Sequence, residues 1–171
     1  MTGTHWRPAY IALGSNLDDP PLQVRRALDE LAGIEGVRMI LCSDLYASDP
    51  LGPPGQPRYV NAVAGVLTTL EPRALLTAML EVERRMGRVR AERWGPRRID
   101  LDLICMAGVR VVEPDLTLPH PEVPERNFVL YPLAEIAPSL ELPGLGRVSE
   151  LATRVHPAGI QPLQPERRSL G

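Results

Sequence analysis

The chain has 171 residues and a net charge of −2, with 44% hydrophobic and 23% charged residues. This balance is that of an ordinary soluble globular protein, and the length fits one domain with a substantial hydrophobic core. No apolar run reaches membrane length and the N-terminus does not resemble a signal peptide, which argues against membrane-spanning and secreted classes. We therefore expect a single cytoplasmic domain over residues 1–171, with irregular termini at 1–8 and from about 157 to 171.

The basic residues and the cysteines limit the chemistry. All 19 Lys-or-Arg positions are arginine, so the chain can form neither a lysine-dependent phosphate loop nor a Schiff base. A bound polyanion would be held by guanidinium groups, which favour bidentate phosphate contacts. Cys42 and Cys105 lie in apolar, strand-like stretches and are interpreted as buried side chains in a reducing compartment, without a metal site or a disulfide framework.

The first half of the chain alternates strand-like and helix-like patterns. Strands are expected at 10–14 and 37–46, with a helix at 20–31 between them and Asp19 as its N-cap. Residues 48–57 contain four prolines and two glycines, so they form a loop. A loop of this length in a compact domain is usually functional or disordered.

The second half continues the alternation and then becomes irregular. A strand is expected at 59–70, and the next helix begins at Pro72 and ends before Gly87. The remaining expected elements are an arginine-rich connection at 88–98, a strand at 99–106, a hairpin strand at 109–112 that pairs with it, a proline-rich loop at 114–124, a short helix at 128–136 and irregular chain beyond about 154.

The order strand, helix, strand, strand, helix, strand is that of a split β-α-β sandwich. We therefore predict an α/β (α+β) fold of the ferredoxin-like βαββαβ type, with an antiparallel sheet and C-terminal additions. Because many functions share this architecture, the fold alone does not identify the activity.

The most informative motif is a pair of aspartates at the start of the strand at 99–106. Asp100 and Asp102 are two residues apart and share one face of the strand. Leu101 and Leu103 then point to the core on the other face. Two adjacent carboxylates repel each other and are costly to desolvate, and a divalent cation such as Mg²⁺ offsets both effects. The alternative is an edge strand with one solvated face.

An arginine-rich segment precedes this pair. Seven of the fifteen residues at 84–98 are arginine. Cations beside a metal-binding carboxylate pair are the layout that holds a nucleotide triphosphate, and Trp94 adds an aromatic face for a flat ring. A solvated basic loop and a nucleic-acid patch are the alternatives. Nucleic acid ranks lower, because the two aspartates would repel a phosphate backbone.

A second polar cluster follows the proline-rich loop. His120 lies between two prolines and is held rigidly, and Arg126 follows six residues later. Both side chains could donate to a phosphate oxygen, whereas a single histidine is otherwise more often structural.

Four sequence blocks resemble the hydroxymethyl-dihydropterin pyrophosphokinase family. The most specific block is RWGPRRIDLDLI at 93–104. The other blocks have the family's order and spacing and lie at 9–17, at 49–52 followed by 56–62, and at 118–121 followed by 126–133.

This resemblance implies a monomeric ferredoxin-like enzyme of folate biosynthesis. Such an enzyme transfers the β,γ-pyrophosphoryl group of ATP to the hydroxymethyl oxygen of 6-hydroxymethyl-7,8-dihydropterin, leaving AMP. It also implies two Mg²⁺ ions on Asp100 and Asp102, ATP as co-substrate, and no nucleic-acid or membrane partner. Arg88 and Arg97 join the two aspartates as expected catalytic residues. The expected nucleotide contacts are Glu83, Arg88, Arg90, Trp94, Arg97, Leu103, Thr117, His120 and Arg126.

The resemblance also assigns a pterin site. Tyr59 and Phe128 would sandwich the ring, Asn61 would hydrogen-bond its edge, and Trp94 would close over the site. The backbone at Ser48 and Leu51 would complete the hydrogen bonds. The chain departs from some family members at Leu80, Asp115 and Pro121, on the expected nucleotide side.

Two other functions fit the same architecture. An RNA-binding module would need exposed aromatic side chains on its central strands, and the chain has only one Phe, two Trp and four Tyr. A nucleotide-sensing domain would bind the ligands without catalysis. The appearance of AMP on addition of the pterin distinguishes an enzyme from both.

Overall fold

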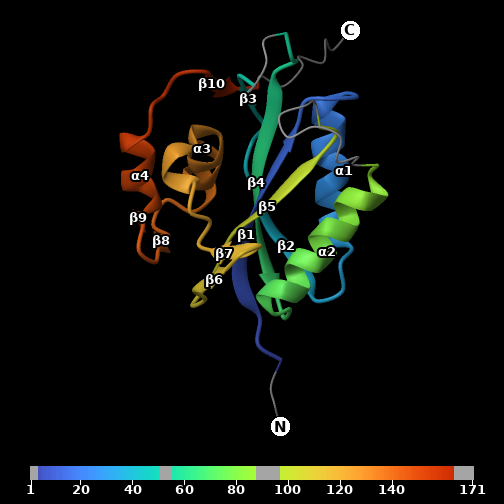
Figure 1. Ribbon diagram of the computed structural model, residues 1–171, viewed down its shortest axis with the longest axis vertical. Helices are drawn as coiled ribbons and strands as arrows, with labels where there is room; N and C mark the ends of the chain where they lie inside the picture. Colours follow the sequence, from blue (N-terminus) through green and yellow to red (C-terminus); the bar gives the residue numbers. More distant parts are fainter. Residues whose placement is uncertain (1–3, 51–54, 88–96, 164–171) are drawn as a thin grey trace, which may run out of the picture.

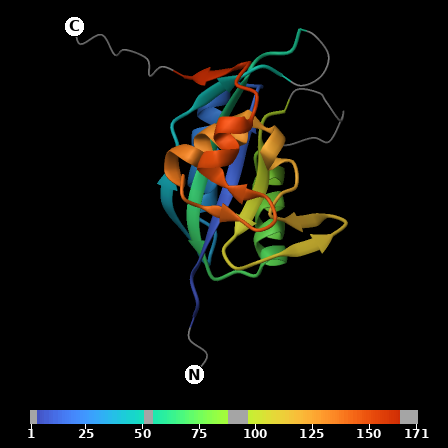
Figure 2. The same cartoon turned by 90° about the vertical axis from the view of Figure 1, so that its left-hand side faces the viewer.

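The structure is a computed structural model that describes residues 4–50, 55–87 and 97–163. A central antiparallel sheet separates two helical layers, with α1 and α2 on one face and α3 and α4 on the other (Figures 1 and 2). The four helices are α1 (Pro20–Ala32), α2 (Pro72–Arg85), α3 (Asn127–Ile136) and α4 (Val148–Arg154). The expected mixed α/β fold with an antiparallel sheet is confirmed.

The main sheet contains six strands in the order β10-β3-β4-β1-β5, with β2 also paired to β4. These strands are β1 (Arg7–Ser15), β2 (Val37–Cys42), β3 (Tyr46–Ser48), β4 (Tyr59–Thr68), β5 (Asp100–Met106) and β10 (Ile160–Pro162). Two small sheets pair β6 (Val111–Glu113) with β7 (Leu116–Leu118), and β8 (Glu141–Leu142) with β9 (Gly146–Arg147). A 3-10 turn, η1 (Val123–Glu125), precedes α3.

Each face of the sheet has its own hydrophobic core. Apolar side chains of α1 and α2, including Val24 and Leu75, pack on one face. Leu130 of α3 and Leu151 of α4 belong to the core on the other face. As predicted for β5, its leucines are buried in the first core, which leaves the two aspartates on the α3 side of the strand.

Strand register aligns residues from three strands across the sheet. Gly14 of β1 is paired with Asn61 of β4 on one side and with Asp100 of β5 on the other. In the same way, Ala12 lies between Val63 and Asp102. The Asn61 amide and the two carboxylates therefore lie on one face of the sheet, on opposite sides of β1.

Three local expectations need correction. The strand at 37–46 is two strands, because Ser43 interrupts it: its Oγ accepts from the Val63 amide at 2.9 Å. Cys42 is exposed at the end of β2, whereas Cys105 is buried as expected. Asp19 has a left-handed φ of 63° and makes no side-chain cap to α1.

The remaining corrections concern long-range pairing. The segment expected at 109–112 pairs with β7, inside the expected proline-rich loop, and not with β5. The expected irregular C-terminus contains β10, which is stabilised by pairing with β3, and the expected irregular N-terminus already enters β1 at Arg7. None of the helices within the described residues is both long and apolar enough to span a membrane.

Candidate active site

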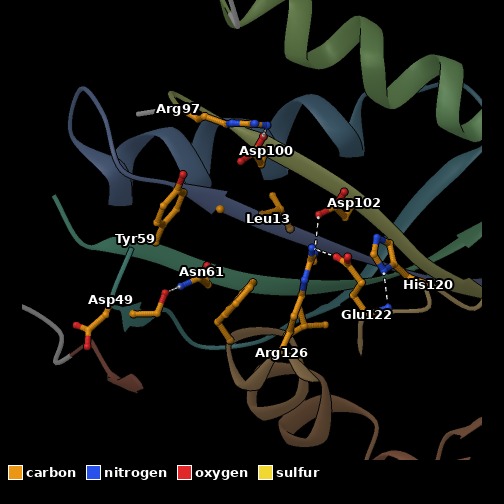
Figure 3. Close-up of a pocket in the computed structure, with 15 residues that line it drawn as sticks. Leu13, Asp49, Tyr59, Asn61, Arg97, Asp100, Asp102, His120, Glu122 and Arg126 are labelled. Atoms are coloured by element: carbon orange, nitrogen blue, oxygen red, sulfur yellow. Dashed lines mark hydrogen bonds and ion pairs between the residues drawn. The ribbon is translucent and has the colours of Figure 1, made fainter. Parts of the chain in front are cut away.

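A cleft of about 370 Å³ lies between the sheet and the N-terminal end of α3 (Figure 3). Its volume is within the usual range for a small-molecule site. The lining residues come from four strands, from the segment that follows β7 and from the start of α3. They are Ala12, Leu13, Gly14, Ser48, Asp49, Tyr59, Asn61, Arg97, Asp100, Asp102, His120, Glu122, Arg126, Phe128 and Val129.

The two aspartates of β5 form the acidic part of the cleft, and an arginine lies beside each. Arg97 Nη1 donates to Asp100 Oδ1 at 3.0 Å. Arg126 Nη1 lies 3.7 Å from Asp102 Oδ2. Carboxylate oxygens on one face match the donors that Mg²⁺ takes when substrate phosphates supply further ligands. No cluster of three or more His, Cys, Asp or Glu side chains suited to a metal ion occurs in the described parts of the chain.

His120, Glu122 and Arg126 form a polar cluster beside Asp102. The Arg126 guanidinium donates to the Glu122 carboxylate, and the Glu122 amide donates to His120 Nδ1 at 3.2 Å. The His120 amide donates to the Ile104 carbonyl of β5 at 2.7 Å, which anchors the cluster to the sheet. Figure 3 shows Arg126 between Glu122 and Asp102.

The His120 ring is suited to donate to an anion. Burial lowers the pKa of His120, and Arg126 lowers it further, while Asp102 and Glu122 oppose the shift. The ring is therefore neutral near pH 7. Because Nδ1 accepts the Glu122 amide, the proton of the neutral ring is assigned to Nε2, which is a hydrogen-bond donor.

The other end of the cleft is less charged and is built around Asn61. Asn61 Nδ2 donates to Ser48 Oγ at 2.7 Å, and both residues are buried. A Cβ at Gly14 would lie only 3.3 Å from Asn61 Oδ1, so glycine keeps this amide oxygen accessible from β1. Tyr59 and Phe128 also line the cleft and supply aromatic faces. The arrangement can receive a flat ring edged with donors and acceptors.

Most of the expected site residues within the described ranges meet in this cleft. Those that line it are Ser48, Tyr59, Asn61, Arg97, Asp100, Asp102, His120, Arg126 and Phe128. Leu51, Arg88, Arg90 and Trp94 lie outside the described residues.

Three expected nucleotide contacts do not line the cleft. Glu83 is buried in α2, where Oε1 accepts from the Leu101 amide at 2.8 Å. Leu103 is buried in the core between the sheet and α1 and α2. Thr117 lies on β7 and donates to the Glu113 carbonyl at 3.3 Å. Their roles at the nucleotide remain predictions.

Besides the apolar Ala12, Leu13 and Val129, sequence reasoning missed four residues in or beside the cleft. Gly14, Asp49 and Glu122 line the cleft, and Glu122 is the acidic partner of Arg126. Asn16 does not line the cleft but hydrogen-bonds to Arg97, which does, and it is 1% exposed. Its signal was a polar residue in the turn after the first strand, and a buried amide at such a position requires hydrogen-bond partners.

Comparisons with known proteins point to one family. The family model for 7,8-dihydro-6-hydroxymethylpterin-pyrophosphokinase (HPPK) matches residues 10–138. The 2-amino-4-hydroxy-6-hydroxymethyldihydropteridine pyrophosphokinase of Pseudomonas aeruginosa is 46% identical over 154 residues, covering 90% of this chain and 95% of that protein. The protein of the same name from Haemophilus influenzae is 43% identical over 143 residues, covering 84% and 89%.

A solved structure of Plasmodium falciparum HPPK-DHPS with pteroate has the same fold, with a TM-score of 0.71 at 12% identity. That match covers 88% of this chain but only 44% of the Plasmodium chain. The family model spans most of the sequence, and the bacterial relatives match it nearly end to end. This chain therefore belongs to the 7,8-dihydro-6-hydroxymethylpterin-pyrophosphokinase family.

Proposed function

We propose that this protein is a 2-amino-4-hydroxy-6-hydroxymethyldihydropteridine pyrophosphokinase of folate biosynthesis. It transfers pyrophosphate from ATP to the hydroxymethyl oxygen of 6-hydroxymethyl-7,8-dihydropterin and releases AMP. The observation that carries the proposal is the alignment of Asn61, Gly14 and Asp100 across three strands. This alignment places an amide suited to a pterin edge and a carboxylate suited to a metal–phosphate group on one face, with only Gly14 of β1 between them.

Asp100 and Asp102 would hold two Mg²⁺ ions, which neutralise phosphate charge when bound. The neighbouring arginines contribute in the same direction. Arg97 and Arg126 already lie beside the two carboxylates, so a triphosphate placed there would meet guanidinium groups on two sides. His120 would add a neutral Nε2 donor. This set positions the phosphates and stabilises negative charge, which is most of what phosphoryl-type transfer requires.

The pterin occupies the Asn61 end of the cleft. Asn61 Oδ1 accepts from the ring edge, because Nδ2 of the same amide is already committed to Ser48 Oγ. Tyr59 and Phe128 stack on the ring, with the Arg126 guanidinium 5.8 Å from the Phe128 ring centroid. Leu51 and Trp94 complete this site, and Glu83, Arg88, Arg90, Leu103 and Thr117 complete the nucleotide site.

We also propose the detailed strand topology, the cellular compartment and the oligomeric state, on the basis of family membership and strand order. The four longest strands lie in the order β2-β4-β1-β5, with β4 and β1 in the middle. This order supports a ferredoxin-like arrangement. The enzyme works as a cytoplasmic monomer on small molecules, without nucleic acid.

The test is the formation of AMP from ATP and Mg²⁺ in the presence of 6-hydroxymethyl-7,8-dihydropterin. The matched control is 6-methyl-7,8-dihydropterin, which keeps the ring and lacks the accepting oxygen. AMP and pterin diphosphate should form in equal amounts with the first compound only. Binding of both ligands without AMP would indicate a sensing domain and would overturn the proposal.

A further inference from the structure

The C-terminal segment at 156–163 packs against both walls of the candidate pterin site. The first wall is β3 with Ser48, and the second is the start of α3 with Phe128. We name the segment the C-terminal strap. It lies beyond the region that the family model matches, which ends at residue 138. In Figure 1 the chain leaves α4, passes α3 and joins the sheet beside β3 as β10.

The strap holds the first wall through β3. Ile160 pairs with Ser48, Asp49 N donates to Gly159 O at 2.9 Å, and Leu163 N donates to Leu45 O at 2.8 Å. β3 has only three residues, and a strand this short has few bonds of its own to fix its register. With β4 on one edge and β10 on the other, Ser48 is constrained from both sides.

The strap holds the second wall through Asn127. The side-chain amide of Asn127 donates to the His156 carbonyl at 2.9 Å and to the Ala158 carbonyl at 2.8 Å. Asn127 is the first residue of α3, directly before Phe128. His156 Nδ1 in turn accepts from the Ala158 amide at 3.2 Å, which keeps the two carbonyls close together.

Gly159 makes the close approach possible. Its φ is +79°, and a Cβ there would lie 2.9 Å from Asp49 Oδ2. Any other residue would have a strained backbone at this φ, and its Cβ would be too close to the Asp49 carboxylate, which lines the cleft.

We propose that the C-terminal strap is a positioning element of the pterin site. It sets the distance between the Ser48 wall and the Phe128 wall, and thereby the affinity for the pterin. The inference rests on the proposed function in naming the pterin as the ligand. A strap that only stabilised the fold would affect the nucleotide and the pterin alike, and this difference makes the role testable.

The experiment uses the full chain and the variants Asn127→Ala and Gly159→Ala. Asn127→Asp serves as an isosteric variant that turns the two donors into repelling acceptors. Thr153→Ala is the matched control, since it removes a side-chain bond to a carbonyl in α4, away from the cleft. A chain that ends at residue 155 lacks the strap, and one that ends at residue 163 keeps it. Calorimetry gives the Kd of a non-hydrolysable ATP analogue, and the Kd of 6-hydroxymethyl-7,8-dihydropterin with that analogue bound.

In the Asn127 and Gly159 variants, and in the chain ending at 155, the pterin Kd should rise about tenfold. The Kd of the ATP analogue should stay within about twofold. A tenfold rise is the size expected for losing the two neutral hydrogen bonds that the Asn127 side chain makes at one wall. The two controls should match the wild type. Equal changes in both Kd values, or no change in either, would overturn the proposal. If the chain ending at 155 does not fold, the point variants decide.

A ligand-free measurement separates this inference from the proposed function. In Asn127→Ala, amide exchange at Asp49 should become faster, because its acceptor Gly159 O belongs to the loosened strap. Unchanged exchange at Asp49 would overturn the strap even in an active enzyme. Absence of AMP formation by the wild type would instead overturn the proposed function.

Discussion

Asn16 and Arg97, one of the residues that line the cleft, exchange a reciprocal pair of hydrogen bonds. Asn16 N donates to Arg97 O at 3.0 Å, and Arg97 N donates to Asn16 Oδ1 at 2.7 Å. Asn16 Nδ2 also donates to the Pro57 carbonyl at 3.3 Å, two residues before Tyr59. One buried amide therefore connects the backbone of Arg97 to the segment that leads into β4, the strand that carries Tyr59 and Asn61.

Asn16→Ala should lower both stability and turnover. The substitution leaves the Arg97 amide without its acceptor, and a buried unpaired donor costs about 1–3 kcal/mol. Displacement of Arg97 should then lower kcat. Urea unfolding and steady-state kinetics measure the two effects. The control is Ser15→Ala, a buried neighbour with one weak bond to Leu17 O at 3.3 Å. Similar behaviour of both variants would show that Asn16 has no special positioning role.

Asp100→Ala and Asp102→Ala should abolish turnover and leave the fold intact. If these carboxylates hold the metal ions, turnover should fall by ~10³-fold or more in either variant at saturating Mg²⁺. The ion pairs with Arg97 and Arg126 are partly exposed, so the free energy of unfolding should change by less than about 1 kcal/mol. Glu141→Ala, which breaks an exposed pair with Arg147 outside the cleft, is the control. Retention of near wild-type turnover in either aspartate variant would contradict the metal assignment.

Local periodicity predicted the parts of the fold that depend on neighbouring residues. The alternation in β5 identified the face of the two aspartates, and the apolar spacing identified α1 and α2 to within one or two residues at each end. Pairings between distant segments could not be obtained in this way. The segment 109–112 was expected to pair with β5 as a hairpin through Gly108, but Val112 is 82% exposed and β6 pairs with β7.

In the candidate site, too, long-range contacts between distant segments were not predictable from local sequence patterns. The family resemblance supplied nine of the residues that line the cleft, and sheet register then explains why Asn61 and Asp100 lie on one face, on opposite sides of Gly14. Asn16 was missed because its partners Pro57 and Arg97 lie 41 and 81 residues further along the chain. The strap was missed for a related reason, since β10 is too short to show a periodic pattern and is stabilised by β3.

Tyr59→Ala and Phe128→Ala should weaken pterin binding far more than nucleotide binding. Each stacking face contributes on the order of 1 kcal/mol beyond its buried area, or about fivefold in Kd. Calorimetric titration with the pterin and with an ATP analogue measures both affinities. Tyr131→Ala, an aromatic residue of α3 that does not line the cleft, is the control. Normal pterin binding by both variants would place the substrate elsewhere.

His120 should make the stability of the ligand-free protein depend on pH. Because burial lowers its pKa in the folded state, the unfolded chain takes up the proton first as the pH falls. Its contribution to stability is therefore present above the unfolded pKa of about 6.5 and is lost as the pH falls from there toward the folded pKa. Urea unfolding without metal at about pH 7.5 and about pH 5.5 should show a smaller loss on acidification in His120→Gln than in the wild type. Equal losses would contradict the assignment of a neutral, half-buried ring.

Glu122→Gln should strengthen the binding of a nucleotide triphosphate in the absence of metal. The Arg126 guanidinium is paired with the Glu122 carboxylate, so phosphate oxygens must compete with Glu122 for the same donors. Glutamine keeps the shape of the side chain and removes its charge. The pair is partly exposed, so the gain should be about 1 kcal/mol, or roughly fivefold in Kd, at low salt. It should shrink as ionic strength rises, because salt screens partly exposed charges.

The control for this effect is Glu125→Gln, which removes an exposed charge from η1 outside the cleft. A double-mutant cycle with Arg126→Gln isolates the interaction, because the gain from Glu122→Gln should disappear once the guanidinium is gone. Calorimetric titration of an ATP analogue into the four proteins of the cycle measures the coupling. A gain of equal size in Glu125→Gln, or one that persists beside Arg126→Gln, would mean that Glu122 acts only through net charge and does not compete with phosphate for Arg126.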